Sequence, residues 1–121
     1  MSAWAWVAVA LAGGAGAISR FAADRAISRR AGRAFPFGTL TINATGSAVL
    51  GLLTGLALSG DALVIAGTAT IGSYTTFSTW MLETQRLAED GALGGAALNV
   101  GVSLALGVAA AALGRTIGAH L

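Results

Sequence analysis

The chain has 121 residues, of which 55% are hydrophobic and only 10% are charged, and its mean hydropathy is +0.77. Soluble globular domains carry about 25% charged residues, and a water-soluble chain this short would expose extensive apolar surface. The absence of cysteine excludes disulfides, thiol chemistry and thiolate metal sites. The seven basic residues are all arginine, and without an aqueous domain to display them a nucleic-acid-binding function is excluded.

Charged residues divide the chain into four long uncharged stretches, each close to or longer than the roughly 20 residues that a helix needs to cross a bilayer. We therefore predict an all-α membrane protein made of one transmembrane domain, residues 1–121. The first span lacks the basic start of a cleaved signal peptide, and its apolar part is too long for one. The four spans are expected near residues 3–24, 37–58, 62–88 and 92–115.

The arginines are distributed unequally between the two sides of the membrane. With four spans, both termini and the loop near residues 59–61 share one side, which holds only Arg115. The opposite side holds five arginines: Arg25, Arg29, Arg30, Arg33 and Arg86. Because cytoplasmic loops are enriched in arginine and lysine, this bias favours termini outside the cytoplasm. We predict a multi-pass protein of the cell (inner or plasma) membrane.

The 18 glycines predict close helix packing, because small residues let helix backbones approach one another in a membrane. Gly51 and Gly55 form such a face on the second span, and Gly101 with Ala105 forms a weaker one on the fourth. These positions indicate helix contacts and do not identify a function.

Two polar side chains interrupt the first two spans. Arg20 lies near membrane depth, where an ionisable group is costly unless it faces protein, water or a counter-ion. It either pairs with Asp24 one turn later or snorkels to the interface, or it forms a positively charged vestibule that concentrates anions. Asn43 shares a helical face with Thr39 and brings two N–H donors into the membrane, either for interhelical hydrogen bonds or for a ligand.

The third span carries the strongest signal, because seven of the nine residues from Gly72 to Trp80 are glycine or carry a hydroxyl group. Such residues weaken a helix and offer competing local hydrogen bonds. We expect a helix broken mid-membrane, which is tolerated only where the loose backbone lines a cavity or binds an ion. A hydroxyl-rich packing face is the alternative.

Aromatic side chains follow the expected break. Phe77 and Trp80, three residues apart, lie on one side of the segment, and the edges of their rings are electropositive. Together with the Asn43 amide and nearby hydroxyl groups, such edges suit a small dehydrated anion. On the fourth span, Asn99 and Ser103 are four residues apart and share a face, which either extends this polar track or bonds to another helix.

Three blocks of the chain resemble the Fluc (CrcB-type) fluoride channels: Gly13–Arg20, Phe35–Gly51, and Gly72–Trp80 with Glu83. The stretches 38–43 and 75–79 are the most specific, and the resemblance covers essentially the whole chain. It implies a fluoride-selective channel, not an enzyme, that passively exports cytoplasmic fluoride and so reduces its toxicity. It also implies an antiparallel (inverted) dimer of four-helix subunits with two pores at their interface.

The resemblance also implies roles for individual residues. The fluoride pathway would comprise the Asn43 amide, the Phe77 and Trp80 rings, the Ser78 and Thr79 hydroxyls, Ser103 on the fourth span and Arg20 near the vestibule. A structural Na⁺ at the dimer centre would be held by backbone carbonyls of Gly72 and Thr75 from both subunits, and oxygen ligands suit such a hard cation. The implied partners are fluoride, the lipid bilayer and a second subunit.

Three positions depart from the family pattern. Trp80 replaces the usual phenylalanine, and its indole N–H is itself a donor for an anion. Gly107 stands where some members carry a hydroxyl, and Ser73 replaces a common second glycine. The five-to-one arginine bias bears on assembly, because an antiparallel homodimer must insert in both orientations. The partner is therefore either a second copy or an oppositely oriented homologous subunit.

The alternative function is a proton-coupled small multidrug exporter, which also has four helices. Its chemistry requires a carboxylate embedded in the first span, whereas here that span contains Arg20 and no acid before Asp24. A non-transporting scaffold would leave the polar interruption of the third span unexplained. The sequence therefore favours an anion channel.

Overall fold

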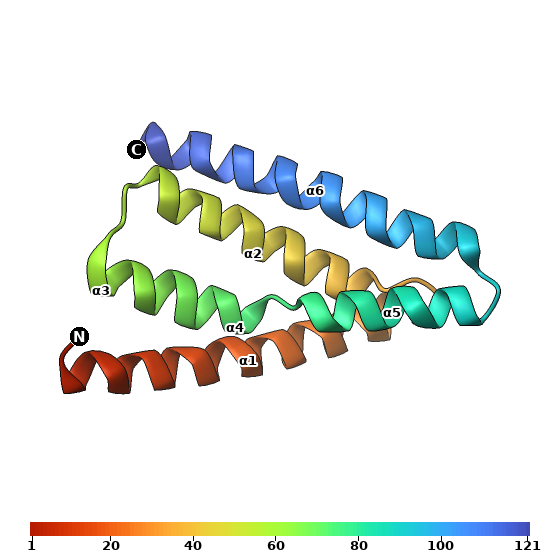
Figure 1. Ribbon diagram of the computed structural model, residues 1–121, viewed down its shortest axis with the longest axis horizontal. Coiled ribbons are helices and arrows are strands. Elements are labelled where there is room, and N and C mark those ends of the chain that lie inside the picture. Colours follow the sequence, from red (N-terminus) through yellow and green to blue (C-terminus); the bar gives the residue numbers. More distant parts are fainter.

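The computed structural model describes all 121 residues, which form helices joined by short loops. The elements are α1 (Ala3–Ala31), α2 (Phe37–Gly55), α3 (Gly60–Leu63), the π-helical segment η1 (Val64–Ile71), α4 (Gly72–Tyr74), α5 (Phe77–Glu89) and α6 (Leu93–Ala119). They make four long rods that run side by side, the third composed of α3, η1, α4 and α5 in succession (Figure 1). The all-helical fold is as predicted.

Three of the rods are single helices long and apolar enough to cross a membrane, namely α1, α2 and α6. The third rod contains no such helix because it is interrupted midway. Helix α1 continues past the predicted end of its span to Ala31 and carries Arg29 and Arg30 in its last turn. Its 29 residues span about 44 Å at 1.5 Å per residue, which exceeds the ~30 Å hydrocarbon core.

The two ends of the molecule differ in charge as the sequence predicts. Both chain termini and the α2–α3 loop lie at one end (Figure 1). The α1–α2 and α5–α6 connections lie at the other end, which holds five of the arginines. The unequal distribution of arginine along the sequence therefore becomes a difference in charge between the two ends of the folded chain.

Helices α2 and α6 approach each other through glycines. A Cβ atom at Gly51 of α2 would collide with the backbone carbonyl of Ala111, and one at Gly114 of α6 would collide with the carbonyl of Ala48. Gly101, in contrast, has no atom near its Cβ position. The close-packing face of α6 therefore lies at Gly114, two to four turns beyond the position that the sequence suggested.

The third rod breaks at Thr75 and Thr76, which confirms the prediction of an interrupted third helix. Both residues are extended, with φ/ψ angles of −81°/162° and −151°/122°. Gly72 remains helical, so the break falls slightly later than the glycine. Helix α5 then starts with Thr76 as its N-cap, whose hydroxyl accepts a hydrogen bond from the backbone N–H of Thr79 at 3.2 Å, a common way to satisfy a free helix terminus.

Helix α1 packs directly against the third rod just before this break. A Cβ atom at Gly16 would collide with the carbonyl of Thr70, and one at Gly13 would lie 3.4 Å from the Ser73 hydroxyl. The contact requires glycine at position 16, since any side chain would push the two rods apart. It places Arg20, one turn further along α1, beside the break.

We predict that Gly114→Ala destabilises the fold by about 1–3 kcal/mol, the usual cost of overpacking a tight contact. The matched control is Gly101→Ala, which adds the same methyl group to the same helix in open space. The measurement is the temperature at which each purified variant loses monodispersity in detergent. Equal midpoints for the two variants would contradict the tight α2–α6 contact.

Candidate functional site

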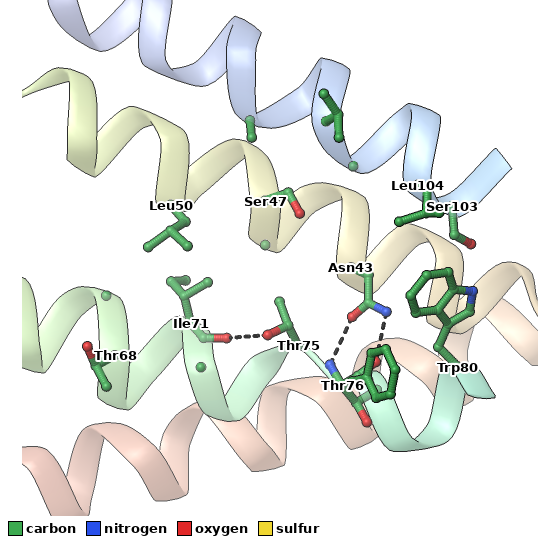
Figure 2. A pocket seen from close by; sticks show the side chains of 17 residues that line it. Asn43, Ser47, Leu50, Thr68, Ile71, Thr75, Thr76, Trp80, Ser103 and Leu104 are labelled. Carbon is green, nitrogen blue, oxygen red and sulfur yellow. Dashed lines mark hydrogen bonds between the residues drawn. The ribbon is translucent and has the colours of Figure 1, made fainter. Parts of the chain in front are cut away.

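A cavity of about 560 Å³ lies between α2, the third rod and α6, on both sides of the helix break (Figure 2). It is lined by four of the predicted pathway residues and by both residues of the predicted sodium site: Asn43, Phe77, Trp80, Ser103, Gly72 and Thr75. The remaining predicted pathway residues, Arg20, Ser78 and Thr79, do not line it. No acidic or basic side chain does so either.

Asn43 bonds to the backbone at the break. Its side-chain Nδ2 donates to the Thr76 carbonyl and its Oδ1 accepts from the Thr76 N–H, each at 2.9 Å (Figure 2). Backbone groups that leave a helix in a membrane need such partners, because no water replaces them. The amide therefore serves interhelical bonding and still keeps one N–H, since Nδ2 carries two and makes one bond within the chain.

Arg20 binds the other residue of the break. Its guanidinium Nη1 donates to the Thr75 carbonyl at 3.3 Å. The alternative of an ion pair with Asp24 is not observed, and the Asp24 carboxylate instead accepts a hydrogen bond from Ser28 at 3.4 Å. The arginine thus places positive charge directly beside the break, and the Thr75 carbonyl keeps a second lone pair.

Phe77 and Trp80 form an edge-to-face pair, with ring centroids 5.6 Å apart and planes at 87°. Phe77 is 70% exposed and lines the cavity with Trp80. The indole Nε1 of Trp80 donates to the backbone carbonyl of Asn99 at 3.0 Å. The hypothesis that this N–H donates to an anion is therefore not supported, because the group already has a partner within the chain.

Ser78 and Thr79 lie at the start of α5. The Thr76 hydroxyl is 3.4 Å from the Ser78 hydroxyl and 3.2 Å from that of Thr79. Both side chains are exposed on the first turn of the helix. In the single chain these hydroxyls contact the capping hydroxyl of Thr76, and neither residue lines the cavity.

The two polar residues of α6 have different surroundings. Asn99 is completely buried, at 0% exposure, and its Nδ2 donates to the Thr84 hydroxyl at 2.8 Å. Of the two alternatives for Asn99, interhelical bonding is the one observed. Ser103 lines the cavity, and its hydroxyl is buried with no hydrogen-bond partner within the chain. Ser103 is therefore a cavity-lining residue of α6 whose hydroxyl is left without a partner in the chain.

Sequence reasoning missed one polar pair beside the site. The Thr39 hydroxyl donates to Oε1 of Glu83 at 2.5 Å, and Thr39 is only 2% exposed. The available signal was the face that Thr39 shares with Asn43, since both turn toward the third rod. Sequence spacing alone did not identify the acid across from Thr39 because the two residues are far apart along the chain.

We predict that Asn43→Leu lowers stability by about 1–3 kcal/mol, because it leaves the N–H and carbonyl of Thr76 without partners. Ser47→Ala is the matched control, one turn further along the same helix face and without a hydrogen bond to lose. Thermal unfolding in detergent would compare the two. A variant at position 43 as stable as the control would show that the amide does not support the break.

Comparisons with known proteins identify one family over most of the chain. Residues 7–115 match the family model of the CrcB-like protein, Camphor Resistance (CrcB). The chain is 57% identical over 112 residues to the fluoride-specific ion channel FluC 2 of Mycobacterium tuberculosis (strain ATCC 25618 / H37Rv), covering 93% of this chain and 89% of that protein. It is 41% identical over 119 residues to FluC 1 of Symbiobacterium thermophilum, covering 93% and 96% of the two chains. The chain therefore belongs to the CrcB-like family, as its three sequence blocks predicted.

Proposed function

We propose that this multi-pass membrane protein is a fluoride-selective channel that passively exports cytoplasmic fluoride down its gradient and so reduces fluoride toxicity. Its curated relatives are named fluoride-specific ion channels, and no catalysis is involved. The observation that carries the proposal is the cavity in which the Asn43 amide, the Ser103 hydroxyl and two aromatic rings converge at a helix break. Fluoride would accumulate in the cytoplasm because neutral HF enters from an acidic exterior and then ionises.

The donors around the cavity suit a small, strongly hydrated anion. Such an ion enters a narrow pore only where close, fixed groups replace its water. Asn43 retains one N–H, Ser103 retains its hydroxyl, and the edges of Phe77 and Trp80 are weakly electropositive. Unpaired buried donors are unfavourable without a ligand, so a passing anion would satisfy groups that the fold leaves free.

The absence of charged side chains from the cavity favours conduction over proton-coupled export of cations. The rival exporter requires an embedded carboxylate that trades protons for substrate, and none of the lining residues is acidic. Arg20, the charge nearest the break, is positive and is held on the Thr75 carbonyl. A positive charge of this kind raises the local concentration of anions and repels cations.

An antiparallel dimer with pores at the interface is part of the proposal. One chain encloses the cavity only in part, because Phe77, on its wall, is 70% exposed. A second subunit would cover this ring and complete the path. The partner is a second copy or an oppositely oriented homologous subunit, and the five-to-one arginine bias favours the homologous subunit, since this bias fixes one orientation.

A structural Na⁺ at the dimer centre would be held by the carbonyls of Gly72 and Thr75 of both subunits. Two features support this placement. The break removes the Thr75 carbonyl from the helical ladder, and both residues line the open cavity. Four neutral backbone oxygens fit a hard monovalent cation, and Arg20 occupies only one lone pair of each Thr75 carbonyl.

Liposomes loaded with fluoride test the function directly. We expect the wild-type protein to release fluoride rapidly and chloride at the rate of empty liposomes. Asn43→Asp should reduce fluoride release to that background, because the substitution places a like charge in the path while keeping the oxygen that accepts from Thr76. Normal efflux from this variant would remove Asn43 from the pathway, and a wild-type protein that fails to release fluoride would refute the channel itself.

Assembly is testable because the chain has no cysteine. A single cysteine at the cavity residue Thr68 should cross-link poorly when the chain is expressed alone and efficiently when it is co-expressed with a homologous subunit of opposite arginine bias. Replacing Na⁺ by N-methyl-D-glucamine should lower the yield if sodium holds the centre together. A cross-linked, fluoride-conducting homodimer would refute the need for a partner, and a yield independent of Na⁺ would refute the ion site.

A further inference from the structure

Trp80 and Asn99 form a closed set of hydrogen bonds between α5 and α6. The Trp80 indole donates to the Asn99 carbonyl at 3.0 Å. In return, the Asn99 amide donates to the Thr84 hydroxyl at 2.8 Å and, at 3.4 Å, to the Trp80 carbonyl. The Thr84 hydroxyl donates to that same carbonyl at 2.8 Å. Each of the two helices thus supplies both a side chain and a backbone group.

We infer that Asn99 is a positioning residue that fixes the Trp80 ring and, through it, Phe77. Asn99 is completely buried and is not among the residues that line the cavity, so it cannot touch a permeating ion directly. Its side-chain amide bonds α6 to α5 beside Trp80. This bond fixes the position of the Asn99 backbone carbonyl along α5, and that carbonyl accepts from the indole N–H. The bearing of this pair on conduction rests on the proposed function.

The orientation of the Asn99 amide is determined by its neighbours. Its nitrogen faces two acceptors, the Trp80 carbonyl and the Thr84 oxygen, whose own hydrogen is used on that carbonyl. A flipped amide would set its oxygen against the Trp80 carbonyl, which is repulsive because neither atom carries a hydrogen. In this orientation the amide oxygen has no partner within the chain.

Fixing Trp80 also restrains the more exposed ring. Phe77 is 70% exposed, and its aromatic contact within the chain is the edge-to-face pair with Trp80. Because the indole N–H is bound to Asn99, Trp80 offers only carbon-bound hydrogens and its ring face to the cavity. Toward an ion, Trp80 thus behaves as a large hydrocarbon ring, and its hydrogen bond to Asn99 of α6 holds that ring in position.

Fluorescence of Trp80 tests the positioning without any transport measurement. The chain has three tryptophans, so Trp4→Phe and Trp6→Phe leave Trp80 as the only one. In this background Asn99→Leu should lower the fluorescence anisotropy of Trp80 and shift its emission. Thr116→Val is the control on the same helix, since its hydroxyl bonds within α6 to Ala112, and it should leave both readouts unchanged.

Fluoride efflux then measures coupling between the two residues. With Trp80 present, Asn99→Leu should change the efflux rate by about threefold or more, the size expected for one interhelical hydrogen bond in a membrane. In a Trp80→Phe background, which lacks the indole N–H, the same change should have little further effect. An equal fold-change in both backgrounds would overturn the inference and assign Asn99 a purely structural role.

A second pair of variants decides the matter if Asn99→Leu fails to fold. Thr84→Val removes the hydroxyl that accepts from Asn99 and should reproduce the change in Trp80 fluorescence, whereas Thr84→Ser keeps a hydroxyl and should behave as wild type. Unchanged fluorescence in Thr84→Val would overturn the inference. Failure of the wild-type protein to release fluoride would instead refute the proposed function, because the fluorescence readout does not depend on transport.

Discussion

The structure depends on one constraint, which is that backbone groups freed from a helix inside a membrane must find partners within the protein. The break at Thr75 and Thr76 frees such groups in the middle of the third rod. Asn43 from α2 binds both backbone groups of Thr76, and Arg20 from α1 binds the Thr75 carbonyl. Two neighbouring helices are therefore committed to supporting a break that the apolar composition of the chain would otherwise disfavour.

Close glycine contacts make this support geometrically feasible. Gly16 brings α1 against the third rod immediately before the break, so that Arg20 reaches it, and Gly114 holds α6 against α2. Helix α6, which packs on α2, is also bonded to α5 through Trp80 and Asn99. The cavity lies between α2, the third rod and α6, which these contacts hold in place. Its lining includes Asn43, which keeps one N–H, and Ser103, whose hydroxyl has no partner within the chain.

Much of the polar lining of the cavity could be predicted from the sequence, because polar residues are costly in lipid and therefore informative. An amide at position 43, a hydroxyl at 103 and a glycine- and hydroxyl-rich stretch are each unfavourable in hydrocarbon, so each predicted a specific contact, and all three converge on the cavity. Ser78 and Thr79 were harder to place, since hydroxyls near a helix start are equally suited to capping. The Thr39–Glu83 bond was missed because it joins residues distant along the chain.

The sequence by itself determined that the chain crosses a membrane several times, that its third helix is interrupted, and which family it resembles, because these follow from composition, local spacing and motif. Only the tertiary structure decided how the polar groups are used. It gave the Trp80 N–H to Asn99 rather than to an anion, turned Arg20 toward the break rather than toward Asp24, and left Ser103 unpaired. Hydrogen bonds between helices depend on rotation and height of one rod relative to another, and no local pattern in a single chain encodes these quantities.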